Sequence, residues 1–222
     1  HHRSTYKKRY IIDLCCDGEV KLMSDIIRPK QFVGLHGHSG FSNYDGLSLP
    51  QKHIDFVLSN GMNAWALTDH GHANGHAHAF SKASELKSKG VDFKFVPGVE
   101  FYFHPDLKQW QRDIASARDK RNDVSSDADD GQDGQAPASI ENEEETKQTK
   151  WFDPVKRRHH LVVLAKDRRG LENLYTLVTR GYDEGLYRFP RIDFDMLKTH
   201  SEGLVVSTAC IGGPIAYEVM KQ

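Results

Sequence analysis

Four short apolar runs constrain the fold most, because each carries an imidazole or a carboxylate at one end. They lie at residues 32–38, 64–70, 95–100 and 159–165. The apolar spacing predicts helices at 49–60, 77–89, 170–181, 194–200 and 215–220. It predicts strands at 32–36, 64–68, within 93–103, at 161–165 and at 204–207. Strands that alternate with helices indicate βαβ units and a parallel sheet. The polar side chains that follow the strands should then gather on one rim of an α/β barrel, where active sites of such folds lie.

The first candidate ligands are His36 and His38, two residues apart on the first apolar run. In a strand, side chains at this spacing point to the same side. Neutral imidazole is the commonest metal ligand among side chains, although this pair alone is explained equally well by a structural role. Asp45 lies in the following loop and can reach back as a carboxylate ligand. Taken alone, Asp45 is better explained as a turn residue, since Tyr-Asp-Gly is favourable turn chemistry.

The other candidate ligands stand next to apolar residues. Asp69 and His70 end the second run, where a buried charge needs a partner or a metal. One of them can bind the metal while the other orients it through a hydrogen bond. Glu100 lies among apolar residues, so a cation is a reasonable partner, and His160 opens the fourth run. Cys210 alone is more often a small buried residue, but its thiolate would suit Zn²⁺.

Imidazoles together with carboxylates favour a hydrolytic metal site. Clustered metals lower the pKa of bound water and neutralise the oxygens of a phosphate ester. The sequence has no Walker-type phosphate loop and no evident Ser-His-Asp order, so nucleoside triphosphate chemistry has no local support. Three further histidines in the loop after His70 are expected at the surface or in secondary roles: His72, His76 and His78.

Charge is distributed unevenly along the chain. Residues 119–146 hold ten acidic and two basic side chains, and the remainder holds 28 basic and 21 acidic ones. A basic remainder is compatible with a polyanionic partner. The segment 105–150 has few large apolar residues and is predicted to be a disordered acidic insertion. Residues 1–30 are read as an N-terminal extension without an assigned role.

Three cysteines do not make a disulfide framework, and no secretory signal is evident. Both observations favour a reducing cytoplasm. No apolar run approaches the roughly 20 residues that a membrane-spanning helix needs. The sequence therefore predicts a cytoplasmic protein that does not enter a membrane.

Four motifs together resemble the PHP (polymerase and histidinol phosphatase) domain family. They are His-x-His-Ser-x-x-Ser-x-x-Asp-Gly at 36–46, Thr-Asp-His-Gly at 68–71, Pro-Gly-x-Glu at 97–100 and His-His-Leu-x-x-Leu-Ala-Lys at 159–166. The resemblance covers about 31–103 and 151–220, so that residues 31–222 are assigned to this domain. The run from His200 to Gly213 is typical of the branch found at the N-terminus of the bacterial DNA polymerase III alpha subunit.

The resemblance implies a distorted (β/α)7 TIM-like barrel with a trinuclear site for Zn²⁺, Mn²⁺ or both. Asp69 would support the ligands. The ligands implied by position are His36, His38, Asp45, His70, Glu100, His160 and Cys210. The family's last ligand pair, an Asp-x-His beyond the cysteine, does not occur before Gln222. The barrel is therefore expected to be C-terminally incomplete, and the chain to be a fragment of a longer subunit or a split product.

Three functions follow from the resemblance. The first is a metal-dependent 3′–5′ exonuclease within a replicative DNA polymerase, which itself would use Mg²⁺ at its polymerase site. The second is a metal-poor scaffold of that polymerase, and the third is a stand-alone phosphoesterase. The implied partners are DNA, the remaining polymerase domains, and replisome subunits such as the clamp and a proofreading subunit.

Overall fold

The computed structural model describes residues 13–14, 20–21, 32–43, 45–126 and 158–220. The chain divides into two compact units, His1–Phe32 and Val33–Gln222. In the first unit, β1 (Asp13–Leu14) and β2 (Val20–Lys21) form a short antiparallel pair. Most of the predicted N-terminal extension, including Cys15 and Cys16, lies outside the described residues.

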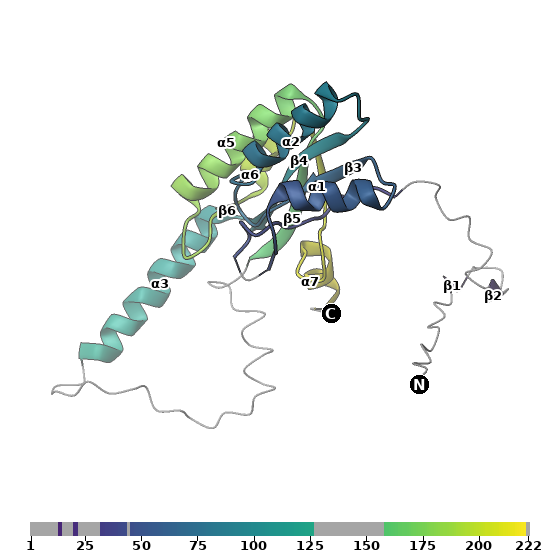
Figure 1. The fold of residues 1–222 in the computed structure, drawn as a ribbon. Helices are drawn as coiled ribbons and strands as arrows, with labels where there is room; N and C mark the ends of the chain where they lie inside the picture. Colours follow the sequence, from purple (N-terminus) through teal and green to yellow (C-terminus); the bar gives the residue numbers. More distant parts are fainter. Residues whose placement is uncertain (1–12, 15–19, 22–31, 44, 127–157, 221–222) are drawn as a thin grey trace, which may run out of the picture. The chain divides into compact units, whose positions relative to one another are not determined.

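The second unit alternates helices with strands (Figure 1). Its helices are α1 (Pro50–Ser59), α2 (His76–Ser88), α3 (Leu107–Ser126), α5 (Arg168–Glu184), α6 (Phe194–Thr199) and α7 (Pro214–Met220). Its strands are β3 (Ala64–Leu67), β4 (Lys94–Phe103), β5 (His159–Ala165), β6 (Arg191–Ile192) and β7 (Leu204–Ser207). The predicted strand at 32–36 is reduced to a single parallel bridge between Gly34 and Trp65.

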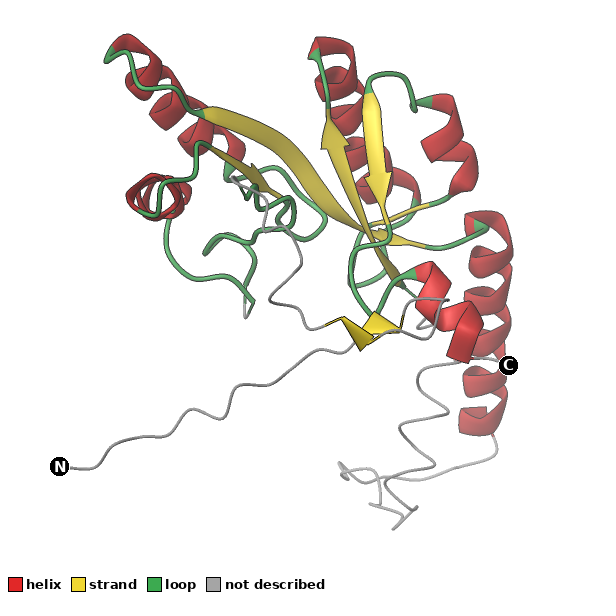
Figure 2. Cartoon of the chain, turned by 90° about the vertical axis from the view of Figure 1, so that its right-hand side faces the viewer, coloured by secondary structure: helices red, strands yellow, loops and turns green. Residues whose placement is uncertain are grey.

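The strands form a mixed sheet with helices around it (Figure 2). Their order is β3-β4-β5-β7, and β6 also pairs with β4. Strands β3 and β6 run parallel to β4, whereas β5 runs antiparallel to both β4 and β7. The prediction of a parallel sheet is therefore wrong for β5. Apolar spacing locates a strand but does not give its direction, and an antiparallel strand needs no βαβ crossover. Among the described strands we find a mixed α/β sheet, and barrel closure stays a prediction.

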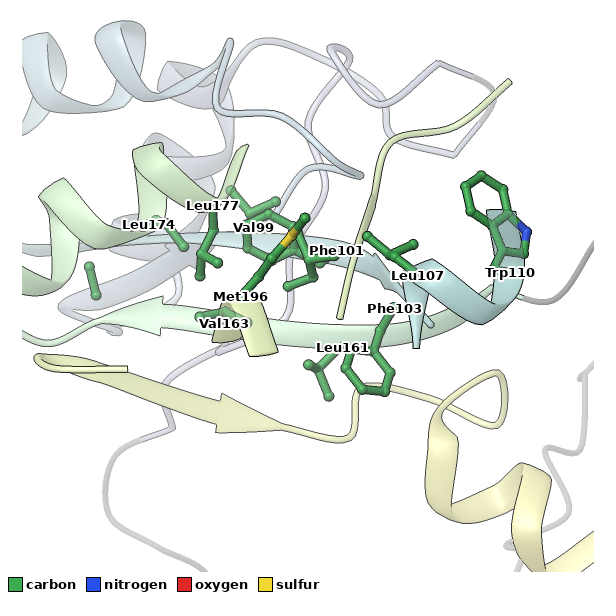
Figure 3. Packing of buried hydrophobic residues seen from close by; sticks show 12 residues of the cluster. Val99, Phe101, Phe103, Leu107, Trp110, Leu161, Val163, Leu174, Leu177 and Met196 are labelled. Atoms are coloured by element: carbon green, nitrogen blue, oxygen red, sulfur yellow. The ribbon is translucent and has the colours of Figure 1, made fainter. Parts of the chain in front are cut away.

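Strand β4 separates the core from the candidate site by simple alternation. Val99, Phe101 and Phe103 point to one face, and Glu100 and Tyr102 point to the other. The first face packs against α5, α6 and the start of α3 (Figure 3). The buried residues of this core are Val99, Phe101, Phe103, Leu107, Trp110, Leu161, Val163, Ala165, Leu174, Leu177, Ile192 and Met196. The core thus holds the strands in place from one side and leaves the other face of β4 for polar groups.

A second core lies under α1 and α2. It joins Ile54 and Val57 of α1 to Trp65 and Leu67 of β3, and it includes Phe95 at the start of β4. Helix α1 has Pro50 in its first turn, where a missing N–H costs nothing. This core fixes the direction of β3 and hence the position of the loop that follows it.

Helix α3 overturns part of the predicted disordered insertion. It begins at Leu107, and the side chains of Leu107 and Trp110 are only 3% and 2% exposed. The backbone N–H of Leu107 also donates to Asp193 (3.4 Å). Apolar residues at 107, 110 and 114 have helical spacing that the surrounding charges obscured. Beyond its first turns α3 runs away from the sheet (Figure 1), and the predicted insertion beyond residue 126 lies outside the described residues.

Within the described residues, no helix combines the length and the apolar character that crossing a bilayer requires.

Candidate metal centre

The first two histidines are held against the end of β3 by backbone hydrogen bonds. Ala66 N–H donates to the Gly34 carbonyl (2.8 Å), and Thr68 N–H donates to the Gly37 carbonyl (2.7 Å). Gly37 lies so close to β3 that an added Cβ would stand 2.6 Å from Trp65 Nε1. The glycine between the histidines therefore allows residues 34–38 to pack closely against β3, which places His36 and His38 at the site.

Asp69 organises the loop after these histidines and does not contact the other predicted ligands. Its buried carboxylate accepts hydrogen bonds from Ser39 N–H (2.7 Å) and from the Ser39 hydroxyl (2.8 Å). A third bond comes from the Ser42 hydroxyl (3.2 Å), whose oxygen also accepts from His70 N–H (2.9 Å). Asp69 thus ties the 39–42 loop to the end of β3, consistent with its predicted supporting part.

Glu100 is the centre of the cluster. Its carboxylate is 1% exposed, and Oε2 lies 2.6 Å from His36 Nε2 and 2.9 Å from His38 Nε2. Its other oxygen, Oε1, lies 2.7 Å from His160 Nδ1. One buried carboxylate therefore faces three imidazoles from two different parts of the chain.

Asp45 and His70 extend the cluster on the exposed side. Asp45 Oδ2 lies 2.8 Å from His70 Nε2 and 3.7 Å from His38 Nε2. The rings of His38 and His70 stack with their centroids 4.5 Å apart. Asp45 is half exposed, so this end of the cluster is open to a substrate.

Burial and the histidines act on the Glu100 carboxyl in opposite directions. Burial alone would raise its pKa, but the contacts with His160, His36 and His38 bring the pKa well below its usual range. Conversely, Glu100 raises the pKa of His36, whereas burial lowers the pKa of His70. The site therefore keeps an ionised carboxylate among imidazoles, which is the donor set that Zn²⁺ and Mn²⁺ accept.

Six of the seven predicted ligands come together in three overlapping groups. Within each group the donor atoms lie within 4.8 Å of one another, and the groups are His36–His38–Glu100, His38–Asp45–His70 and His70–Glu100–His160. One buried atom of the cluster, His70 Nδ1, lacks a hydrogen-bond partner among the described residues. Because buried polar atoms are normally satisfied, this atom fits the binding of a cation.

The seventh predicted ligand, Cys210, lies at the edge of the cluster. Its Sγ is 3.6 Å from His160 Nδ1, yet Cys210 is exposed and belongs to none of the three groups. Its thiol also accepts a hydrogen bond from Gly212 N–H (3.3 Å). The structure thus brings Cys210 near the cluster without joining it to the other ligands.

The three further histidines that follow His70 lie outside the three ligand groups. His72 contacts the Phe41 carbonyl (3.1 Å), and His78 contacts Gln51 (3.0 Å). His76 is buried, contrary to a surface position, and contacts the Gly98 carbonyl (2.9 Å).

Several residues of the site had no predicted role. Ser39 and Ser42 stand in the first motif, so their fixed spacing was the available signal. Tyr102 stacks on His70 with ring centroids 5.5 Å apart and an interplanar angle of 5°. Its position two residues after Glu100 on the same face of β4 was the signal for Tyr102. The site therefore includes hydroxyls and an aromatic wall in addition to the ligands.

Comparison with known proteins identifies the family. The family model of the PHP domain matches residues 34–222. The DNA polymerase III subunit alpha of Aquifex aeolicus (strain VF5) is 33% identical over 188 residues, which cover 85% of this chain and 13% of that protein. The same subunit of Treponema pallidum (strain Nichols) is 30% identical over 190 residues, covering 86% and 13%. The chain thus spans about one eighth of the length of these curated relatives.

Among solved structures, an amidohydrolase from Chromobacterium violaceum aligns with a TM-score of 0.33 and 20% identity over 65% of this chain and 32% of that one. A likeness this weak carries no argument. The family assignment rests on the matched domain and on the polymerase relatives. The chain therefore belongs to the PHP domain family and is homologous to DNA polymerase III alpha subunits.

Proposed function

We propose that the chain binds up to three Zn²⁺ or Mn²⁺ ions and hydrolyses phosphodiester bonds at a DNA 3′ end. It would do so as the PHP domain of a DNA polymerase III alpha subunit. The observation that carries the proposal is the Glu100 carboxylate, which is buried, ionised and faced by His36, His38 and His160. A buried charge of this kind needs cationic partners, and metal ions would supply them at a site that is open on the Asp45 side.

The residues of the site would have two roles, metal binding and support of the ligands. His36, His38, Asp45, His70, Glu100 and His160 would hold the metals, with Cys210 joining if its thiolate turns toward His160. When bound, the metals would lower the pKa of water and offset the charge of the phosphate. Asp69 would keep the 39–42 loop in place, so that His38 and His70 stay stacked at a fixed distance.

The wider context belongs to the same proposal. The parent subunit would polymerise DNA with Mg²⁺ at a separate site, and the other polymerase domains, the clamp and a proofreading subunit would be its partners. The relatives' name supports this context, since both are DNA polymerase III alpha subunits. The closure of the sheet into a distorted (β/α)7 barrel and a cytoplasmic location are further parts of the proposal.

Hydrolysis and metal binding can be tested together with one substitution. We expect the chain to release nucleotides from the 3′ end of a labelled oligonucleotide when Mn²⁺ or Zn²⁺ is present. Glu100→Gln removes the central charge and should weaken Mn²⁺ binding by at least 10–100-fold, roughly the loss that even an outer-shell partner causes. Calorimetric titration measures the affinity, and gel analysis measures the release.

The matched control is Glu85→Gln on α2, because Glu85 is exposed and pairs with Lys82 and Lys89. The control should bind metal and release nucleotides as the unchanged chain does. If the unchanged chain binds neither metal and releases no nucleotide, the proposal is wrong.

A metal-poor scaffold is the second candidate function, and the position of Cys210 favours it. Cys210 lies outside all three ligand groups of the described residues, so the cluster lacks its thiolate there. A metal-poor scaffold would show no nucleotide release and no gain in thermal stability from Mn²⁺ or Zn²⁺. A stand-alone phosphoesterase has no comparable support, since the relatives named above are polymerase subunits.

A further inference from the structure

An exposed arginine, Arg158, packs against two aromatic rings beside the cluster. Arg158 immediately precedes β5, and its guanidinium carbon lies 4.3 Å from the centroid of the Phe189 ring. The same carbon lies 5.6 Å from the Tyr102 ring. The two rings contact each other with centroids 5.0 Å apart. Arg158 is therefore held by cation–π contacts with both rings.

Tyr102 connects this arginine to the candidate metal ligands. One face of its ring stacks on His70, and its ring also meets His160 edge to face at 5.6 Å. Only one aromatic ring thus separates the Arg158 guanidinium from two predicted ligands. A phosphate next to one bound at the cluster would lie within reach of a side chain as long as arginine.

The loop that carries Phe189 is fixed from below. The buried guanidinium of Arg191 donates to the carbonyls of Tyr187 and Phe189, both at 2.9 Å. It also lies 4.4 Å from the centroid of the Trp110 ring on α3. Two hydrogen bonds and this contact hold the loop, so Phe189 offers a rigid support for Arg158.

Arg158 differs from the paired arginines of α5 in having no carboxylate partner among the described residues. Arg168 and Arg180 form ion pairs with Glu172 and Glu184 on α5. No carboxylate of a described residue lies within ion-pair distance of Arg158. A guanidinium that is stacked but unpaired keeps its hydrogen-bond donors free for a planar pair of oxygens, as a phosphate provides.

We propose that Arg158, supported by Phe189 and Tyr102, binds the phosphate next to the scissile one in a nucleic-acid strand. Arg158 is thus a positioning residue that favours a strand over a substrate with a single phosphate. The inference rests on the proposed function, because it takes the cluster as the place of cleavage. Arginine with interleaved aromatic rings is also the composition of surfaces that bind single strands.

The test compares two substrates in the full 222-residue chain. One is a fluorescein-labelled oligothymidylate, and the other is thymidine 5′-(p-nitrophenyl phosphate), which has one phosphate only. Arg158→Ala should raise KM for the oligonucleotide about 10-fold, leave its kcat unchanged, and leave hydrolysis of the small ester unchanged. Arg158→Lys keeps the charge but not the planar guanidinium. Its KM for the oligonucleotide should therefore lie between those of the unchanged chain and Arg158→Ala. The control is Arg168→Ala, an exposed arginine beyond the opposite end of β5.

Binding supplies a readout that does not need activity. By fluorescence anisotropy, Arg158→Ala should bind the oligonucleotide about 10-fold more weakly. Its plot of log affinity against log salt should be flatter by about 0.7, the loss of one phosphate contact in a single strand. Phe189→Leu removes the support but keeps the charge, and it should weaken binding by a smaller factor.

The outcomes separate this inference from the proposed function. If the unchanged chain hydrolyses neither substrate, the proposed function fails and the anisotropy result still decides whether Arg158 binds a strand. If Arg158→Ala binds the oligonucleotide as tightly as Arg168→Ala does, or slows both substrates equally, the inference is overturned.

Discussion

At the scale of single residues, the candidate site depends on two buried carboxylates with different tasks. Glu100 faces imidazoles, whereas Asp69 faces serine hydroxyls and a backbone N–H. Glu100 lies within β4 and Asp69 follows the end of β3, and burial of either charge is tolerated only because its partners are in place. The partners therefore distinguish a metal ligand from a residue that holds a loop.

We predict that Asp69→Ala weakens both the fold and the metal site. The substitution leaves buried donors of Ser39 and Ser42 unpaired, which should lower the free energy of unfolding by about 1–3 kcal/mol. Loss of this support should also weaken Mn²⁺ binding by roughly 10–100-fold. Urea unfolding in chelator and calorimetric titration measure the two effects. Asp92→Ala, which removes an exposed carboxylate that contacts Asn63, should change neither.

At the scale of elements, the loop at residues 39–46 is held by close contacts within its own backbone. Asp45 N–H and Gly46 N–H both donate to the Ser42 carbonyl, at 3.2 and 3.0 Å. A Cβ on Gly46 would stand 1.9 Å from the Ser39 carbonyl oxygen. The position therefore needs glycine for space, and the same contact sets where the Asp45 carboxylate lies.

Gly46→Ala should consequently push Asp45 away from His70. We expect a loss of about 1–3 kcal/mol in the free energy of unfolding, as in other overpacked sites, together with weaker Mn²⁺ binding. Gly181→Ala within α5 is the matched substitution, because its Cβ would meet no atom closer than 3.4 Å. That variant should gain about 0.4–1 kcal/mol and keep its metal affinity. Equal Mn²⁺ affinity in both variants would contradict this account of the loop.

Most elements could be predicted from the sequence, but their directions could not. The apolar spacing located α1, α2, α5, α6 and β7 to within about three residues at each end. Periodicity carries no information on strand direction, so β5 was predicted parallel although it runs antiparallel to β4. Helix α3 was missed because only its first turns are apolar, and long-range contacts of Leu107 and Trp110 with the core stabilise it.

At the scale of the whole molecule, the site is easier to predict by residue type than by geometry. His36, Glu100 and His160 are far apart in sequence, and only the pairing of β3, β4 and β5 brings them together. Motifs name such residues without giving distances. They therefore could not show that Cys210 stays outside the three groups, or that the loop clamped by Arg191 places Phe189 beside Tyr102. Those positions depend on packing between distant segments.

His76 joins α2 to β4 and α5, and its titration should be visible in the stability of the whole fold. Its Nε2–H donates to the Gly98 carbonyl of β4 (2.9 Å), and its Nδ1 accepts from the Tyr175 hydroxyl of α5 (3.1 Å). Burial lowers the pKa of His76 below the ordinary value of 6.5, so the folded protein keeps the ring neutral.

Below about pH 6.5 the unfolded chain binds a proton that the folded chain does not, so stability should fall as the pH decreases. His76→Gln removes this difference. In chelator, between pH 7 and pH 5, its free energy of unfolding should depend less steeply on pH than that of the unchanged chain. The difference in slope can reach about 1.4 kcal/mol per pH unit, the value for one proton. His78→Gln on the same helix should keep the original slope. Parallel curves for His76→Gln and the unchanged chain would show that His76 does not link α2 to β4 and α5 as a neutral imidazole.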